Sequence, residues 1–284
     1  SLKESMVTSL TLVVIAAAIT VSSWVLQGIV PVGIIQLLTA IAIAGVFATI
    51  GMSLEKLGLG EFWGQEEVNE TAVCNLASLA LPKFINKNKT YNFNKLYDIA
   101  YDAIVNLNNV IDVNFYPSPS AKFSNLCHRP VGLGVQGLAD VFFQLGLPYE
   151  SEEAKQLNKD IFETIYYASI KASCDLAKEQ GTYATYEGSP ISQGKFQFDL
   201  WGTKPSKRWD WDKLREEVKK WGVRNSLTTC IMPTASTAQI MGNYEGFEPY
   251  LTNIFVRTTL AGEFVVINEN LVKDLEELNL WSED

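Results

Sequence analysis

Apolar residues recur at helical spacing in three segments of the chain, and residues that start or stop helices bound each segment. Residues 92–107 begin at an Asn that can cap a helix, and their pattern continues towards Ile111. Residues 151–180 open with Ser-Glu-Glu, which joins a cap to an acidic first turn, and a Gly follows them. Residues 211–221 form a shorter amphipathic pattern, again followed by Gly. We predict a helix over each range.

Short apolar or β-branched runs lie between these helices. They are Val131–Val135, Leu227–Met232 and Phe264–Ile267. Runs of this length and composition are typical of buried strands. Helices that alternate with short strands indicate an α/β architecture.

The first part of the chain has a different pattern, because no charged residue occurs from Ser5 to Leu54. Gly and Pro interrupt this region at residues 27–33 and leave two apolar runs, residues 7–26 and 34–52. Each run has about 20 residues, which as a helix would match the roughly 30 Å of a bilayer core. Alanines and a glycine in the runs would let two such helices pack closely.

We therefore predict a transmembrane helical hairpin at residues 1–56, a linker at residues 57–70 and a separate domain at residues 71–284. Both ends of the hairpin would emerge on one side of a membrane, together with that domain. The alternative is a very apolar hairpin buried in a larger soluble assembly. A signal peptide fits poorly, because the apolar stretch is too long and lacks a basic start.

Composition excludes two classes of function. The net charge is −9, whereas a nucleic-acid-binding surface needs a basic face. The four cysteines are widely spaced and a single His accompanies them, so we predict no metal site. We expect Cys127 and Cys174 to be small buried hydrophobic residues.

The segment Gly132-Leu-Gly-Val-Gln-Gly137 matches the spacing of a dinucleotide-binding loop. That use needs a strand before the first Gly, whereas residues 126–130 read as a loop. We expect these glycines to allow close packing of the backbone.

A hydroxyl-rich segment follows the predicted strand at Leu227–Met232. Residues Pro233–Thr237 read as a turn, and residues from Ala238 onward read as the start of a helix. Backbone N–H groups and hydroxyls gathered before a helix suit a phosphate group, but they equally suit an ordinary helix cap. Spacing alone leaves both open.

Several segments together resemble the large subunit of class I ribonucleotide reductase, in its eukaryotic and viral forms. The resemblance runs in order over nearly all of Thr71–Asp284. It is carried by AVCNLASLAL (Ala72–Leu81), HRPVGLGVQGLAD (His128–Asp140), residues Asn158–Pro190, RNSL with MPTASTAQI (Arg224–Ile240), and EPYLTNIFVR (Glu248–Arg257).

This resemblance implies that residues 71–284 form roughly the second half of a ten-stranded α/β barrel. It implies that Cys74 is one thiol of a redox pair that reduces the 2′ position of a ribonucleoside diphosphate. It also implies that Thr234, Ala235, Ser236 and Thr237, with Pro233 beside them, hold the diphosphate of that substrate.

The chain departs from the family pattern at the position of the radical-bearing cysteine. The family has an Asn-x-Cys-x-Glu segment about fifteen positions before the cysteine that Cys74 matches, whereas this chain has Leu57-Gly-Leu-Gly-Glu61. The first half of the barrel, the partner cysteine, the regulatory regions and the C-terminal cysteine tail have no counterpart either. The family has no counterpart of the apolar hairpin.

We therefore expect a reductase-like fragment that is inactive alone and needs a companion chain. We expect no cofactor in this chain, and a radical-generating, metal-containing small subunit is implied only if it acts as a reductase. The alternatives are a non-catalytic accessory subunit of a membrane complex and a truncated product. The location would be a membrane if the hairpin inserts, and otherwise the cytoplasm, which is the family default.

Overall fold

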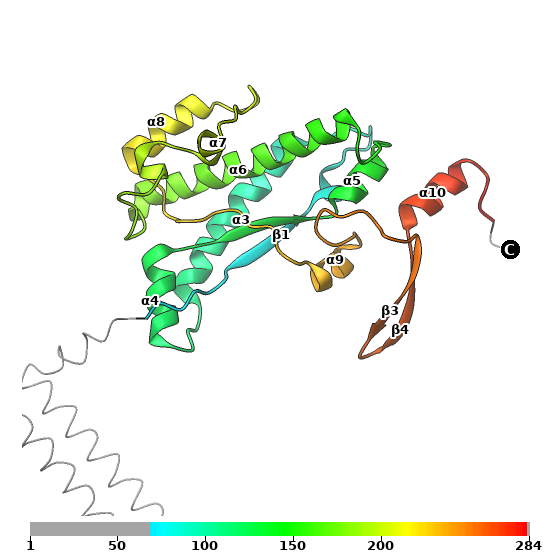
Figure 1. The fold of residues 1–284 in the computed structure, drawn as a ribbon, viewed down its shortest axis with the longest axis horizontal. Helices are drawn as coiled ribbons and strands as arrows, with labels where there is room; N and C mark the ends of the chain where they lie inside the picture. The colour runs from blue at the N-terminus through cyan, green and yellow to red at the C-terminus, as the bar shows by residue number, and fades with distance from the viewer. Residues whose placement is uncertain (1–68, 283–284) are drawn as a thin grey trace, which may run out of the picture. The chain divides into compact units, whose positions relative to one another are not determined.

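A computed structural model describes residues 69–282 (Figure 1). The elements below belong to one compact unit, which begins at Glu70. These elements are β1 Leu76–Ala80, η2 Leu81–Phe84, α3 Phe93–Val113, α4 Pro119–His128, β2 Gly132–Gln136, α5 Leu138–Gln144, α6 Glu152–Gln180, η3 Ile191–Gln193, α7 Gln197–Leu200, α8 Trp211–Trp221, α9 Ala235–Met241, β3 Ile254–Thr259, β4 Gly262–Ile267 and α10 Glu269–Glu277.

The predicted hairpin at residues 1–56, and residues 57–68 of the predicted linker, lie outside the described residues. Within residues 69–282, no helix is both long enough and apolar enough to cross a membrane.

The three predicted helices are confirmed, and their first residues are capped as the sequence indicates. The side chain of Asn92 accepts a hydrogen bond from the Lys95 N–H at the start of α3. Ser151 accepts one from the Ala154 N–H at the start of α6. Each cap satisfies an N–H that has no partner within its helix, which is worth about 1 kcal/mol.

The predicted α/β architecture is confirmed by a parallel pair of strands. Strand β1 pairs with β2 from Leu76 beside Gly132 to Ala80 beside Gln136, and the chain crosses between them through α3 and α4. A parallel bridge from Leu133 to Thr229 adds the next segment at the other edge of β2. The antiparallel hairpin β3–β4 is a separate two-stranded sheet.

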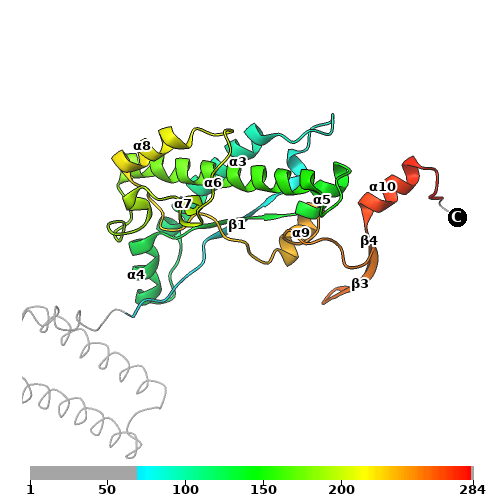
Figure 2. The same cartoon turned by 45° about the horizontal axis from the view of Figure 1, so that its top comes forward.

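Helices α3 and α6 cover one face of the β1–β2 pair, and α9 lies on the opposite face (Figures 1 and 2). Alternate strand residues such as Leu79, Leu133 and Val135 point into the core with Ile104 of α3 and Ile161 of α6. Burying each such side chain contributes about 1.5–3 kcal/mol. This core fixes the sheet on which the candidate residues stand.

The glycines of the Gly132–Gly137 motif serve close packing, as predicted. A Cβ on Gly134 would lie 2.4 Å from the carbonyl oxygen of Cys230, and one on Gly132 would lie 2.9 Å from the Cys230 Cβ. Gly137 has φ +75° and starts α5. The first two glycines lie inside strand β2 and not in a turn after it, so the motif does not form a dinucleotide-binding loop.

The predicted buried strand at Leu227–Met232 was wrong for most of its length. Only Thr229 makes a bridge to β2, and the side chains of Leu227 and Ile231 are 65% and 48% exposed. The backbone of Leu227, Thr228 and Cys230 hydrogen-bonds to Val131 and Leu133, so the segment runs beside β2 only as far as Cys230. After the bridge, the chain turns across Gly134 towards α9.

The prediction of a loop at residues 126–130 was also partly wrong, because α4 runs through His128. Ser118 caps this helix by accepting from the Ala121 N–H, and Pro119 occupies its first position. Arg129 then ends the helix with a left-handed backbone at φ 47°.

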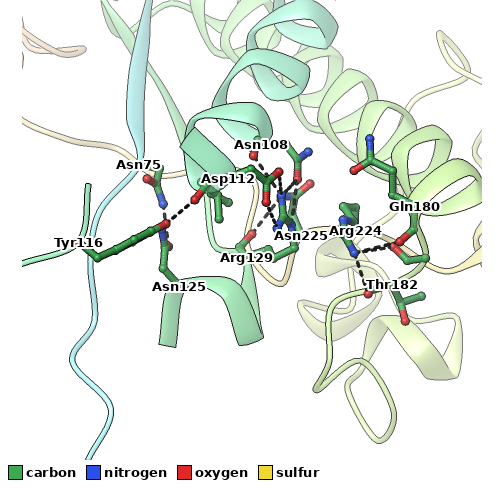
Figure 3. Close-up of polar contacts among 12 residues, drawn as sticks. Asn75, Asn108, Asp112, Tyr116, Asn125, Arg129, Gln180, Thr182, Arg224 and Asn225 are labelled. Atoms are coloured by element: carbon green, nitrogen blue, oxygen red, sulfur yellow. Dashed lines mark hydrogen bonds and ion pairs between the residues drawn. The ribbon is translucent and has the colours of Figure 1, made fainter. Parts of the chain in front are cut away.

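A buried polar network holds these elements together around Arg129 (Figure 3). Its guanidinium donates to Asn108 and, at 2.7 and 2.8 Å, to both carboxylate oxygens of Asp112, all on α3. These hydrogen bonds hold the pKa of the Asp112 carboxyl below its ordinary range. Asn225 donates to the Arg129 carbonyl and accepts from Ser173 of α6. The network therefore ties α3, α4 and α6 to the segment that precedes the bridge.

We predict that Arg129→Met lowers the free energy of unfolding by about 2–3 kcal/mol, because Asn108 loses a charged donor inside the protein. Urea denaturation followed by circular dichroism measures the change. Lys155→Met is the control, because its ion pair with Glu152 is exposed and should contribute less than about 0.5 kcal/mol. Equal midpoints for the two variants would contradict a structural role for Arg129.

Candidate functional site

Cys74 stands two residues before β1, and its side chain is exposed. The residue that follows it, Asn75, is buried and donates hydrogen bonds to Asn125 and to the Pro130 carbonyl. Upstream, the Thr71 N–H donates to the Ser120 carbonyl. The thiol is therefore accessible on a backbone that is held on both sides.

The predicted turn Pro233–Thr237 is shorter than expected, because α9 begins at Ala235 and not at Ala238. Thr234 occupies the cap position and is buried, and its hydroxyl accepts a hydrogen bond from the Gly246 N–H. Its side chain therefore binds the following loop and does not cap the helix. Ala235, Ser236 and Thr237 lie in the first helical turn and are exposed.

An arginine side chain lies beside this helix start, and no role was predicted for it. Arg257 of β3 donates to the Ala235 carbonyl at 3.3 Å and forms an ion pair with Glu245 at 2.9 Å. Arg257 lies in a segment that carries the family resemblance, and this was the sequence feature that could have indicated a role for it. The guanidinium therefore contacts both the Glu245 carboxylate and the start of α9.

A cavity of about 520 Å³ lies between α5, α9, α10 and the β3–β4 hairpin. At its wall, the buried Asp140 accepts from the Tyr244 N–H at 2.8 Å and from the Asn270 side chain at 2.9 Å. It also accepts from the Tyr250 hydroxyl, whose pKa is raised by burial and by the neighbouring carboxylate. These donors use both Asp140 oxygens in joining α5 to the C-terminal elements.

The structure does not bring Cys74 and the Thr234–Thr237 segment together. Cys74 precedes the first residue of β1, whereas the loop after α9 packs beside the far end of that strand. Asn243, two residues after α9, lies near Pro82 and Gly137, which follow β1 and β2. The two sets of candidate residues thus stand at opposite ends of the sheet.

The other cysteines differ in their surroundings. Cys174 is buried, as predicted, and burial raises the pKa of its thiol to about 11. Cys127 is half-buried, and Cys230 is exposed beside Gly132. Among the described residues, no cluster of three or more His, Cys, Asp or Glu side chains could hold a metal ion.

Comparison with known families decides the assignment. Residues 60–284 match the family model described as ribonucleotide reductase, barrel domain. The chain belongs to this family. The match begins within the segment predicted as a linker.

Individual ribonucleotide reductases agree with this assignment. The chain is 57% identical over 216 residues to the ribonucleoside-diphosphate reductase large chain of Schizosaccharomyces pombe, covering 76% of this chain and 26% of that protein. The large subunit of Arabidopsis thaliana is 53% identical over 75% of this chain and 28% of its own length. The large subunit of Acanthamoeba polyphaga mimivirus is 54% identical over 76% and 25% respectively. The chain thus spans about a quarter of the length of these relatives.

For this ribonucleotide reductase barrel segment, we predict that iodoacetamide at neutral pH alkylates Cys74 and Cys230 much faster than Cys174. The thiolate is the reactive form, so a pKa near 11 and burial both slow Cys174. Mass spectrometry of peptides from the native chain over a time course measures each rate. The rates should converge in urea. Equal native rates at Cys74 and Cys174 would contradict the described burial.

Proposed function

We propose that this chain supplies one part of a ribonucleotide reductase barrel, namely a loop for the substrate diphosphate and one thiol of a redox pair. It would act on ribonucleoside diphosphates only together with a companion chain that supplies the radical-bearing cysteine and the partner thiol. Membership of the family supports this proposal, and the two sets of residues that match the family's site support it further.

The observation that carries the proposal is that Thr234 is buried and held by the following loop, whereas the residues after it are exposed. Thr234 is buried and fixed by Gly246, which sets the position of the turn. The Ser236 hydroxyl remains on an exposed helical turn whose first N–H groups have no partner within the helix, whereas the Thr237 hydroxyl donates to the Thr234 carbonyl at 3.4 Å. Donors of these two kinds suit phosphate oxygens.

The phosphate would be held by these individual donors and by the nearby Arg257, with a small contribution from the helix dipole. Helix α9 has seven residues, so few peptide dipoles are aligned. The Arg257 guanidinium is within reach of the helix start, where it already donates to the Ala235 carbonyl. A dianionic ligand could draw it away from Glu245.

Cys74 would serve as a reductant with a second thiol from the companion chain. In that step the two thiols lose two hydrogen atoms and form one S–S bond, while the ribose 2′-hydroxyl leaves as water and its carbon gains hydrogen. The radical that starts the reaction would come from a separate, metal-containing small subunit. Radical initiation needs the cysteine that this chain lacks, so we expect no reduction by the chain alone.

We predict that Ser236→Ala weakens binding of a ribonucleoside diphosphate such as ADP by about 10- to 100-fold, which corresponds to one lost hydrogen bond to a charged group. Equilibrium dialysis with the full chain measures the dissociation constant. Ser206→Ala removes an exposed hydroxyl before α8 and serves as the matched control. The proposal fails if both variants bind ADP equally, or if adenosine binds as tightly as ADP.

A non-catalytic role as an accessory subunit of a membrane complex is the second candidate. The observation that favours it is the stretch without charged residues from Ser5 to Leu54. The chain should then stay in the membrane fraction through a carbonate wash and be released by detergent. Release by carbonate alone would exclude anchoring by a spanning hairpin.

A further inference from the structure

The backbone on either side of Cys74 is attached to helix α4. Upstream, Glu70 accepts a hydrogen bond from the Ser124 hydroxyl at 3.0 Å, and Thr71 bonds to Ser120 through both its N–H and its hydroxyl. All three contacts join the chain immediately before Cys74 to α4. The residues between these contacts and Asn75 carry the exposed thiol.

Downstream, Asn75 is attached through three hydrogen bonds. Its side-chain amide donates to the Asn125 side chain at 2.8 Å and to the Pro130 carbonyl at 3.0 Å, and its own carbonyl accepts from the Gly132 N–H at 2.9 Å. Asn75 is only 5% exposed. One residue therefore joins the chain beside Cys74 to α4, to the loop after α4 and to β2.

Asn125 is itself fixed by a relay that reaches α3 (Figure 3). Its amide donates to the Tyr116 hydroxyl, which donates to the Ile111 carbonyl in the last turns of α3. Asn125 is fully buried and Tyr116 is half-buried, so water has little access to the Asn125 end of the relay. The position of residue 75 is thus tied to α4 and, through Tyr116, to the end of α3.

We propose that Asn75 and Asn125 are positioning residues that hold the Cys74 backbone in place, so that its sulfur can meet a thiol from another chain. Disulfide formation requires Cα atoms about 4.4–6.8 Å apart with defined Cβ directions, so a freely moving backbone would rarely satisfy it. Cys74 has an exposed side chain on an anchored backbone, which combines access with a fixed position. This inference rests on the proposed redox role of Cys74.

The test measures the motion of residue 74 directly. A nitroxide is attached to Cys74 in the full chain carrying Cys127→Ala, Cys174→Ala and Cys230→Ser, and its electron paramagnetic resonance spectrum is recorded. Asn75→Ala should convert the spectrum from its slow component to a mobile one. Asn75→Asp should do the same, because it keeps the shape and loses the donor.

Asn225→Ala is the matched control, because Asn225 is as buried as Asn75 and has a comparable number of hydrogen bonds, which go to Ser173, Asn108 and the Arg129 carbonyl. It should lower stability and leave the Cys74 label slow. Unchanged label motion in both Asn75 variants would overturn the proposal. Equal loosening by Asn225→Ala would also overturn it, because the effect would then be global.

A second measurement separates this inference from the proposed function. In the native complex with its companion chain, Asn75→Ala should lower kcat for diphosphate reduction by about 10- to 100-fold with little change in KM, since misplacement by about 1 Å has effects of that size. If no complex reduces ribonucleotides, the proposed function fails while the label result still decides the inference. Normal kcat in this variant would overturn positioning by Asn75.

Discussion

The parallel pairing of β1 with β2 is the constraint on which the rest of this structure depends. Parallel strands are stable when both faces of their sheet are covered, because their side chains are apolar on both sides. Helices α3 and α6 cover one face of the sheet. Among the described residues, α9 and the chain at Cys230 lie against the other face. Large apolar side chains such as Leu76, Leu227 and Ile231 consequently remain exposed. The companion chain of the proposed function would cover them.

The polar residues of the segments that carry the family resemblance divide into two groups in the structure. Arg129, Asn225 and Asn75 are buried, and their side chains donate hydrogen bonds that join the helices to the segments beside the sheet. Cys74, Ser236 and Thr237 are exposed on backbone that the first group and Thr234 hold in place. Polar residues in a shared motif can therefore be structural supports for a site, and burial distinguishes the supports from the groups that could meet a ligand.

The sequence predicted the long helices well, because their signals are local. Asn92 and Ser151 mark helix starts by cap chemistry, and the spacing of apolar residues in α3 and α6 follows the face that packs on the sheet. Strand β1 was not predicted, because LASLA has little β-propensity and becomes a strand by pairing with β2. The strand at Leu227–Met232 was over-predicted for the opposite reason. Its composition favours a strand, but the hydrogen bonds to β2 end at Cys230 and leave a single bridge at Thr229.

The candidate site shows the same limit. The family resemblance gave Cys74 and residues 233–237, and the glycines were correctly expected to allow close packing. The resemblance could not show that Thr234 turns inward to Gly246 or that Asn75 anchors the chain beside Cys74, because both depend on contacts between distant segments. It also could not show that Cys74 and the helix start lie at opposite ends of β1.

The central proposal is that Cys74 forms a redox pair with a thiol of a companion chain. The most direct measurement is to isolate the chain with its native partners, let the complex turn over without added reductant, block free thiols and identify the disulfide-linked peptides by mass spectrometry. The account predicts that the peptide containing Cys74 is linked to a cysteine peptide of another polypeptide. Recovery of Cys74 entirely as the blocked free thiol, or linked to Cys127 or Cys230 of its own chain, would contradict it.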